Sequence, residues 1–412
     1  MAVKVAFFDA KSYDKDSFNA TNKDFGFEIH YYKERLSMNT VDLAKGKDAV
    51  CIFVNAECDA RVIDRLEKYG VKLIALRCAG FNNVDLKAAK DRIPVVRVPA
   101  YSPHAVAEYA VTLMLALNRK VYRAANRTRE FNFKLNGLMG FDMYGKTIGL
   151  IGMGRIAKVL TQILEGFGMN IIAYDKYPDL EFYKQHQVTA VTLDELYAQS
   201  DIISLHCPLT EETKFIINRE SIGKMKKGVM IINTGRGKLI NTEDLIEGLR
   251  SHQVGAAGLD VYEEEQKFFY EDLSDKMIDD DKLALLLMIP NVIVTSHQAF
   301  FTQEALHNIA TTTLQNIKDW HDAVAEYKHM HGKEMPKAEV KVEKTIHLTI
   351  AEFDKAANDL FEDCKWVQEN KDLMRVDEDG VWHMIALQCK DRNYKILINS
   401  EGFSYPRYTA IV

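Results

Sequence analysis

The 412-residue sequence has few cysteines, no long apolar run and no excess of basic charge. Its six cysteines form no Cys-x-x-Cys pair, so we expect reduced core thiols, with neither a disulfide framework nor a bound metal. No apolar run is long enough to cross a bilayer and the N-terminus is strand-like, which predicts a cytoplasmic protein without a membrane partner. A formal net charge of −6, without a long basic run, argues against nucleic acid as a partner.

Strand-like and helical runs alternate along most of the chain, a pattern typical of parallel sheets. Ser102 and Pro103 are typical of the start of a long helix, with Ser102 as its N-cap. Strands are expected on both sides of this helix, at Val3–Phe8, Ala49–Val54, Leu73–Arg77, Val95–Val98, Thr147–Ile151, Asn170–Asp175, Asp201–Leu205, Val229–Asn233, Gly258–Val261 and Val292–Thr295. We therefore expect an α/β protein with two Rossmann-like domains, each built on a doubly wound parallel sheet.

The order of these runs predicts that the first domain is discontinuous in sequence. We place it at residues 1–101 and 299–327, with a returning helical segment at Thr302–Asp322, and we place a dinucleotide-binding domain at 102–298. A lysine-rich stretch without apolar periodicity, residues 328–344, is a predicted linker. Residues 345–412 predict a small α+β module, with strands and one helix at Thr345–Ile350, Ala351–Cys364, Val381–Cys389, Tyr394–Asn399 and Tyr405–Val412. We expect this module to be an appendage outside the active site.

The segment from Thr147 to Ala157 reads as a buried strand that runs through glycines into a helix. Gly152 allows a tight turn, and Gly154 lets a pyrophosphate approach the backbone. The small Ala157 lets the helix pack closely on the sheet. Together these residues predict a dinucleotide-binding turn.

Residues on either side of this turn complete the predicted cofactor site. The helix begins at Arg155 and Ile156, where unpaired backbone N–H groups suit a negative phosphate. Asp175 ends the next strand, the position from which an acidic side chain accepts hydrogen bonds from the adenosine ribose. The sequence therefore predicts NAD as the cofactor, rather than a dinucleotide with a 2′-phosphate.

Arg236, Glu265 and His297 each follow a predicted strand in the dinucleotide-binding domain. Ligands gather at this edge of an open α/β sheet. A guanidinium can bind a carboxylate with two parallel hydrogen bonds, and an imidazole can transfer a proton near neutral pH. A carboxylate beside that imidazole can fix its tautomer and favour its charged form. Each residue type alone is more often structural, but together they suit hydride transfer to an α-keto acid.

Seven segments have a pattern typical of one enzyme family: Leu76–Asp85, Val98–Pro103, Thr147–Ala157, Ser204–Thr210, Asn233–Gly237, Leu259–Glu263 and His297–Phe300. Through them the sequence resembles the D-2-hydroxyacid dehydrogenases, in particular the bacterial fermentative D-lactate dehydrogenases, over about residues 1–325. By this resemblance, Arg236, Glu265 and His297 are the catalytic residues. It also implies a substrate such as pyruvate, a dimer formed through the dinucleotide-binding domains, and nicotinamide or ribose contacts near Cys207, Pro208, Thr234 and Asp260.

The same resemblance implies where the substrate binds. The backbone amides of Ala79 and Gly80 would contact its carboxylate, and Tyr101 and Phe300, with Phe53 nearby, would form a small pocket. Two alternatives stay open. One is a sibling enzyme for another 2-keto acid, such as a hydroxyisocaproate or phosphoglycerate dehydrogenase. The other is an NAD-sensing corepressor of the same superfamily, which the acidic composition disfavours as a direct DNA binder.

Overall fold

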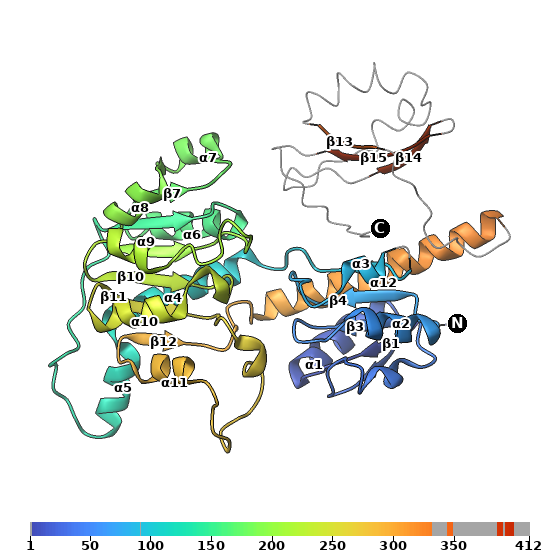
Figure 1. Ribbon diagram of the computed structural model, residues 1–412, viewed down its shortest axis with the longest axis horizontal. Helices are drawn as coiled ribbons and strands as arrows, with labels where there is room; N and C mark the ends of the chain where they lie inside the picture. Colours follow the sequence, from blue (N-terminus) through green and yellow to red (C-terminus); the bar gives the residue numbers. More distant parts are fainter. Residues whose placement is uncertain (1, 91, 332–343, 349–384, 390–391, 399–412) are drawn as a thin grey trace. The chain divides into compact units, whose positions relative to one another are not determined.

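The computed structural model describes residues 2–90, 92–331, 344–348, 385–389 and 392–398 (Figure 1). The chain divides into two compact units, which we call unit 1 (Met1–Tyr101 with Leu306–Val412) and unit 2 (Ser102–Ala305). Unit 1 is thus assembled from two separate stretches of sequence. None of the helices in the described ranges is both long enough and apolar enough to cross a membrane.

Unit 2 contains a seven-stranded parallel sheet in the order β12-β11-β10-β9-β6-β7-β8. Its strands are β6 (Thr147–Ile151), β7 (Asn170–Tyr174), β8 (Thr189–Ala190), β9 (Ile202–Leu205), β10 (Val229–Asn233), β11 (Val254–Leu259) and β12 (Val292–Val294). The strand order reverses between β6 and β9, and in open α/β sheets such a switch point is where ligands bind. The doubly wound sheet expected for this unit is confirmed.

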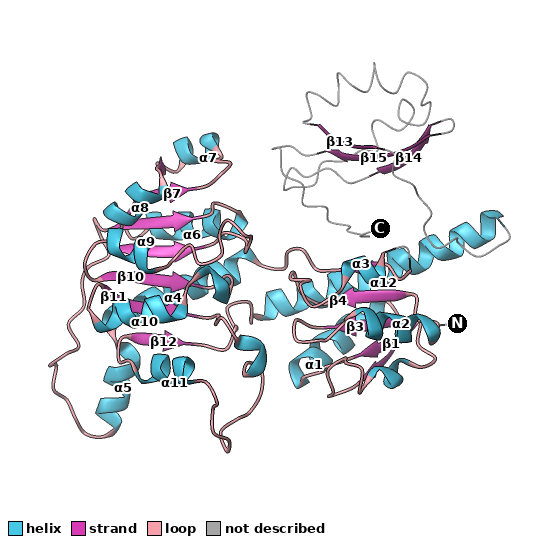
Figure 2. Ribbon diagram, in the orientation of Figure 1, coloured by secondary structure: helices cyan, strands magenta, loops and turns pink. Residues whose placement is uncertain are grey.

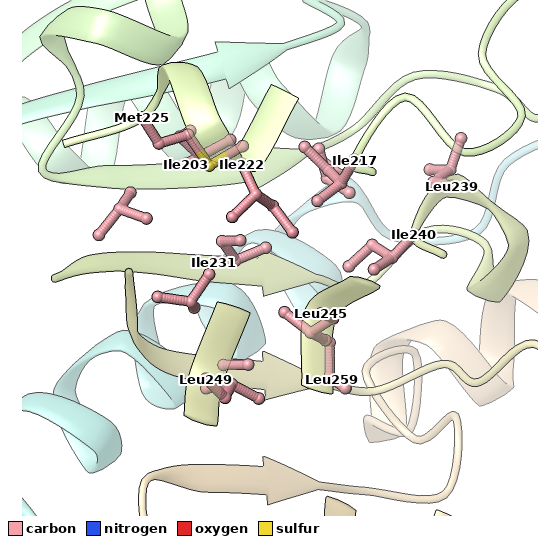
Figure 3. Packing of buried hydrophobic residues seen from close by; sticks show 14 of the residues in the cluster. Ile203, Ile217, Ile222, Met225, Ile231, Leu239, Ile240, Leu245, Leu249 and Leu259 are labelled. Atoms are coloured by element: carbon pink, nitrogen blue, oxygen red, sulfur yellow. The ribbon is translucent and has the colours of Figure 1, made fainter. Parts of the chain in front are cut away.

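Helices cover both faces of this sheet because neighbouring residues along each strand point to opposite sides. Ile203 and Ile231 pack with α8 (Leu193–Gln199), α9 (Arg219–Lys224), α10 (Thr242–Arg250) and α11 (Asp281–Met288). Ile202 and Ile232 pack with α4 (Pro103–Arg119) and α6 (Arg155–Glu165). Figure 2 shows the helices on the two sides of the strands, and Figure 3 shows the first of these cores at close range. The remaining helices of unit 2 are α5 (Val121–Arg129) and α7 (Leu180–Gln185).

One local signal predicted from the sequence appears in unit 2, and one strand boundary differs. The Ser102 hydroxyl accepts a hydrogen bond from the N–H of Ala105 and caps α4, as expected. The predicted strand at Gly258–Val261 is wrong at both ends, because β11 begins at Val254 and ends at Leu259. Small residues dominate β11, so its apolar pattern is weak, and Asp260 lies just beyond the strand.

Unit 1 contains a five-stranded parallel sheet in the order β2-β1-β3-β4-β5. Its elements are β1 (Lys4–Phe7), α1 (Ser12–Thr21), β2 (Glu28–Tyr31), β3 (Ala49–Ile52), α2 (Ala60–Lys68), β4 (Leu73–Leu76), α3 (Leu86–Ala89) and β5 (Val95–Val96). The sequence analysis missed β2. That strand lies at the edge of the sheet and carries no fully buried residue, so it lacks the apolar pattern that marks the others.

The helix α12 (Gln303–His331) extends beyond the segment expected from the sequence. It was predicted to end at Asp322, and the first four residues of the predicted linker 328–344 are helical instead. No glycine or proline interrupts the sequence between Gln303 and His331, so nothing in the backbone chemistry ends the helix earlier.

The C-terminal residues that the structure describes form a three-stranded sheet in the order β13-β15-β14. Its strands are β13 (Lys344–Leu348), β14 (Ile385–Cys389) and β15 (Arg392–Ile398), and β15 runs parallel to β13 and antiparallel to β14. They overlap three strands predicted for this region. The predicted helix Ala351–Cys364 and strand Tyr405–Val412 lie outside the described residues.

Candidate active site

The glycine turn after β6 has the conformation that the sequence predicts. Gly152 has φ +90°, and a Cβ added there would lie 2.6 Å from the backbone N of Cys207. Its own N–H donates to the carbonyl of Tyr174 at 2.8 Å. Two features therefore exclude a side chain at Gly152: the left-handed backbone conformation and the close backbone of Cys207 at the switch point.

The start of α6 offers open space beside its backbone. Gly154 is the N-cap, and apart from its chain neighbours no heavy atom of the described residues lies within 4 Å of the position that a Cβ would take. Arg155 and Ile156 form the first helical residues, while Ala157 is fully buried against the sheet. This arrangement lets a phosphate approach the first N–H groups of the 11-residue helix.

Asp175 holds the glycine turn in place. One carboxylate oxygen accepts a hydrogen bond from the N–H of Met153 at 2.6 Å, and the other accepts from the N–H of Tyr177 at 2.8 Å. Each carboxylate oxygen has a further lone pair, so both can still accept from ribose hydroxyls. The neighbouring Lys176 pairs with Glu212 at 3.2 Å.

The loop that carries Arg236 is fixed by the side chain of Asn233, the last residue of β10. Asn233 accepts from the N–H of Gly235 at 3.0 Å and donates to the carbonyl of Arg236 at 2.9 Å. Beyond the loop, Leu239 anchors the chain in the core (Figure 3). Within the described chain, the one hydrogen bond from the Arg236 guanidinium goes to the carbonyl of Gly235 at 2.8 Å. Most of its N–H donors are thus available to an anion.

A glycine brings the Arg236 loop next to the turn that follows β11. A Cβ added at Gly237 would lie 2.1 Å from the carbonyl oxygen of Tyr262, so only glycine allows this close approach. The N–H of Tyr262 in turn donates to a carboxylate oxygen of Glu265 at 3.1 Å. The loops after the adjacent strands β10 and β11 therefore meet at the base of the Arg236 side chain.

Glu265 and His297 form a hydrogen-bonded pair. The other carboxylate oxygen of Glu265 lies 2.9 Å from Nδ1 of His297, and both side chains are about one-fifth exposed. Among the described residues, Nε2 of His297 has no hydrogen-bond partner. The imidazole is therefore held at one nitrogen and presents the other, as a proton donor must.

The backbone of His297 is strained, with φ +53°, a value uncommon for residues other than glycine. Its N–H donates to the carbonyl of Asp260 at 2.7 Å, and its carbonyl accepts from the hydroxyl of Tyr270 at 3.0 Å. Such strain persists only where the surroundings impose it, and it is common at functional sites.

Asp260 supplies much of this restraint. Its fully buried carboxylate accepts from the hydroxyl of Thr295 at 2.6 Å and from the N–H groups of Gln298 and Ala299 at 2.9 and 2.8 Å. Burial raises the pKa of Asp260, and these three donors oppose the rise. The predicted contact with nicotinamide stays a prediction. In the structure, the Asp260 carboxylate holds the loop around His297 through these three hydrogen bonds.

The other predicted cofactor contacts lie near the switch point. Thr234 is buried, and its hydroxyl has no partner in the part of the chain that the structure describes. Burial raises the pKa of the Cys207 thiol to about 11, so this cysteine is protonated at neutral pH. The carbonyl of Pro208 accepts from the hydroxyl of Thr213 at 2.6 Å and fixes the start of the following loop.

The predicted substrate contacts are divided between the units. Phe53 follows β3 in unit 1, and Ala79 and Gly80 follow β4 in the same sheet. Tyr101 ends the first stretch of unit 1, and its carbonyl accepts from the amide of Asn308 at 2.6 Å. Phe300 belongs to unit 2, where it is buried beside Phe301, with ring centroids 6.1 Å apart.

His206, which follows β9 at the switch point, was not predicted as a site residue from the sequence. Its Nε2 lies 2.8 Å from the hydroxyl of Ser204, and burial lowers its pKa to about 4. His206 is therefore neutral at physiological pH. The position of a histidine after a strand in the predicted sheet was the available signal, but its burial could not be deduced from the sequence.

A histidine–carboxylate pair alone does not mark this site. Nδ1 of His186 lies 2.8 Å from Glu165, which matches the geometry of the Glu265–His297 pair. However, His186 follows α7 and precedes β8, so it lies near the amino end of a strand, away from the edge where ligands gather. The Glu265–His297 pair lies at the carboxyl ends of the strands, where a substrate can bind, and the Glu165–His186 pair does not.

Comparison with known proteins agrees with this arrangement. Residues 111–299 match the NAD binding domain of the D-isomer specific 2-hydroxyacid dehydrogenases. The 2-hydroxyacid dehydrogenase A of Aspergillus oryzae is 51% identical over 322 residues, which cover 77% of this chain and 92% of that protein. The D-lactate dehydrogenase of Escherichia coli is 49% identical over 318 residues, which cover 77% and 96% respectively.

Solved structures give the same result. The pyruvate reductase of Chlamydomonas reinhardtii has a TM-score of 0.74 and 45% identity, with coverage of 77% of this chain and 96% of that chain. The chain therefore belongs to the family of D-isomer specific 2-hydroxyacid dehydrogenases. It is an NAD-dependent oxidoreductase, and its own residues fit that cofactor at the Gly152 turn, at the open space beside Gly154 and at the Thr234 hydroxyl, which no described residue engages.

Proposed function

We propose that this enzyme is a D-lactate dehydrogenase that reduces pyruvate. The proposal rests on one observation: three side chains follow three adjacent strands of one sheet. Arg236, which has available donors, follows β10, while the hydrogen-bonded pair of Glu265 and His297 follows β11 and β12. Two similar proteins, the D-lactate dehydrogenase of Escherichia coli and the pyruvate reductase of Chlamydomonas reinhardtii, support pyruvate as the substrate.

Each catalytic side chain has a distinct role in this proposal. The Arg236 fork binds the substrate carboxylate and polarises the keto oxygen. Bound NADH supplies the hydride that forms the new C–H bond at the keto carbon. His297 donates the Nε2 proton to the keto oxygen, which forms the O–H bond of the product. Glu265 orients the ring through Nδ1 and stabilises its cationic form before transfer.

The other proposed contacts concern binding. The amides of Ala79 and Gly80 bind the substrate carboxylate, and Phe53, Tyr101 and Phe300 limit the size of the substrate side chain. No hydrogen bond within the described chain occupies the N–H of Ala79 or Gly80, which supports this role. Asp175 selects NADH, because a carboxylate repels a 2′-phosphate.

Steady-state oxidation of NADH tests the proposal. Pyruvate should give a higher kcat/KM than 2-ketoisocaproate or 3-phosphohydroxypyruvate, and the reverse reaction should consume D-lactate but not L-lactate. Preference for either larger acid would identify a sibling dehydrogenase. NADH binding without turnover of any 2-keto acid would favour the NAD-sensing corepressor.

We also infer that a second copy of the chain covers an apolar segment of unit 2. Five large apolar side chains there are between 69% and 86% exposed: Phe131, Phe133, Leu135, Met139 and Tyr144. The segment is held against unit 2, since Asn118 donates to the carbonyl of Phe141 at 2.8 Å. Exposed apolar clusters of this kind typically mark protein interfaces. Light scattering should give a dimer for the wild type and a monomer for F131S/L135S.

The domain roles are further proposals. Unit 2 binds NAD, unit 1 contributes substrate contacts, and the C-terminal module is dispensable for turnover. A chain that ends at Tyr327 should fold, bind NADH and reduce pyruvate. If it folds but is inactive, the C-terminal residues serve the catalytic site. A cytoplasmic location is proposed as well, because the NADH pool that the enzyme uses is intracellular, and cell fractionation tests it.

A further inference from the structure

Among the described residues of unit 1, one arginine is buried: Arg77, which directly follows β4 and precedes the loop that contains Ala79 and Gly80. Its side chain is 2% exposed and that of its ion-pair partner, Asp14, is 8% exposed, with 3.4 Å between Nε and the carboxylate. Burying a charged pair is costly, and replacement by apolar residues is often neutral or stabilising. A buried arginine directly after a strand therefore indicates a role other than stabilising the fold.

The Arg77 guanidinium connects the carboxyl ends of three neighbouring strands. Its Nη atoms donate to the carbonyls of Phe8 and Asp9, just after β1, at 3.1 and 2.8 Å. Its Cζ lies 4.8 Å from the ring centroid of Phe53, just after β3, and 4.5 Å from that of Phe7. Since β1, β3 and β4 are adjacent in the sheet, one side chain spans all three ends.

The loop after Arg77 is fixed further along its length. The carbonyl of Ala79 accepts from Arg97 at 2.6 Å, and the carbonyl of Gly80 accepts from the thiol of Cys78 at 3.2 Å. Both carbonyls are thus engaged by the protein, while the two N–H groups have no hydrogen bond among the described residues. Arg77 anchors the start of a loop whose N–H groups are presented for an acceptor.

We propose that Arg77 is a positioning residue for substrate binding: it holds the Phe53 ring and the Ala79–Gly80 amides in the arrangement that receives a 2-keto acid. The proposal rests on the proposed function, because it gives those groups their substrate. Arg77 does not itself touch the substrate, since all of its contacts named above are internal. Its effect is on substrate binding rather than on proton transfer.

Arg77→Lys tests this role while preserving the charge beside Asp14. An ammonium group cannot reproduce the planar fork or the flat surface that contacts Phe53. The KM for pyruvate should rise about tenfold, with kcat and the KM for NADH little changed, because loss of uniform binding raises KM alone. If Arg77→Lys fails to fold, the double variant R77M/D14N removes both buried charges and is expected to show the same rise in KM.

A matched control distinguishes positioning from general stability. Arg92 also pairs with two carboxylates in unit 1, those of Asp64 and Glu67, but it precedes β5 and so lies away from the carboxyl ends of the strands. Arg92→Met should lower the melting temperature without changing the KM for pyruvate. A lower melting temperature for Arg77→Lys with an unchanged KM would overturn the proposal.

Hydrogen exchange separates this proposal from the proposed function. The N–H groups of Phe8 and Arg77 are bonded to the carbonyls of Cys51 and Ile52 and should exchange faster in Arg77→Lys, but not in Arg92→Met. If the wild type turns over no 2-keto acid, the proposed function fails, and this exchange comparison alone decides whether Arg77 organises the strand ends. Unchanged exchange, or faster exchange with an unchanged KM, contradicts the positioning role.

Discussion

His206 and His297 follow strands of the same parallel sheet, but their surroundings give them different chemistry. His206 is partly buried and bonded to the hydroxyl of Ser204, and desolvation lowers its pKa to about 4. His297 keeps about one-fifth of its side chain exposed, is bonded to the carboxylate of Glu265 and has Nε2 without a partner among the described residues. Residue type and topological position are thus insufficient to identify the proton donor. The group that is hydrogen-bonded to each imidazole distinguishes the two: a hydroxyl for His206 and a carboxylate for His297.

Replacement of the proposed donor is the largest expected effect. His297→Ala should lower kcat for pyruvate by roughly 10²- to 10⁴-fold, the usual contribution of a positioned acid, while the Kd for NADH is nearly unchanged. Steady-state kinetics and a fluorescence titration of NADH measure the two quantities. His186→Ala is the control, because it removes a histidine–carboxylate pair of similar geometry from the other edge of the sheet. Turnover near the wild-type rate in His297→Ala would mean that another group donates the proton.

The two arginines extend the comparison. Arg236 has donors available, whereas Arg77 uses its donors within the protein. Arg236→Lys should lower kcat/KM for pyruvate on the order of a hundredfold, with a reduced kcat, because the planar fork is lost at the reacting carbonyl. If Arg236→Lys instead raises only the KM for pyruvate and leaves kcat unchanged, Arg236 contributes to substrate binding alone.

His206 should affect stability in acid. Its folded pKa of about 4 lies below the ordinary histidine pKa of about 6.5, so the unfolded chain binds the extra proton first as the pH falls. Stability is therefore lost between about pH 6.5 and pH 4, by on the order of 3 kcal/mol, and is unaffected above this range. Urea unfolding at pH 7 and pH 5 should give a smaller pH dependence for His206→Gln than for the wild type. Equal pH dependence would show that His206 is also protonated in the folded state.

The smallest expected effect concerns cofactor choice. Lys176 lies beside Asp175 and is paired with Glu212, and both paired side chains are exposed. Glu212→Gln should free Lys176 to approach a 2′-phosphate and raise kcat/KM for NADPH about two- to fivefold, in line with the weakness of surface ion pairs. Glu211→Gln is the matched control. No change relative to that control would mean that Glu212 does not restrain Lys176 from the cofactor.

Local patterns in the sequence predicted much of the fold and the candidate site. Gly152 and Gly154 could be assigned because the demand on each is local: a left-handed turn, and an open helix start. Most strands of the two sheets were predicted from apolar runs, but β2 was missed because an edge strand needs no such run. The early end predicted for α12 was wrong because no glycine or proline breaks the helix before His331.

The sequence by itself determined that Arg236, Glu265 and His297 follow strands of one parallel sheet, since parallel strands bring their carboxyl ends to the same edge. Only the tertiary structure decided which atoms of these side chains are hydrogen-bonded within the protein and which are available to a substrate. The partner of His297 lies 32 residues earlier in the chain, and Thr295 bonds a carboxylate 35 residues earlier. Burial and hydrogen bonding between distant segments depend on how the loops pack, which no local pattern encodes. The same packing makes His206 neutral, encloses Arg77 and leaves Nε2 of His297 available for chemistry.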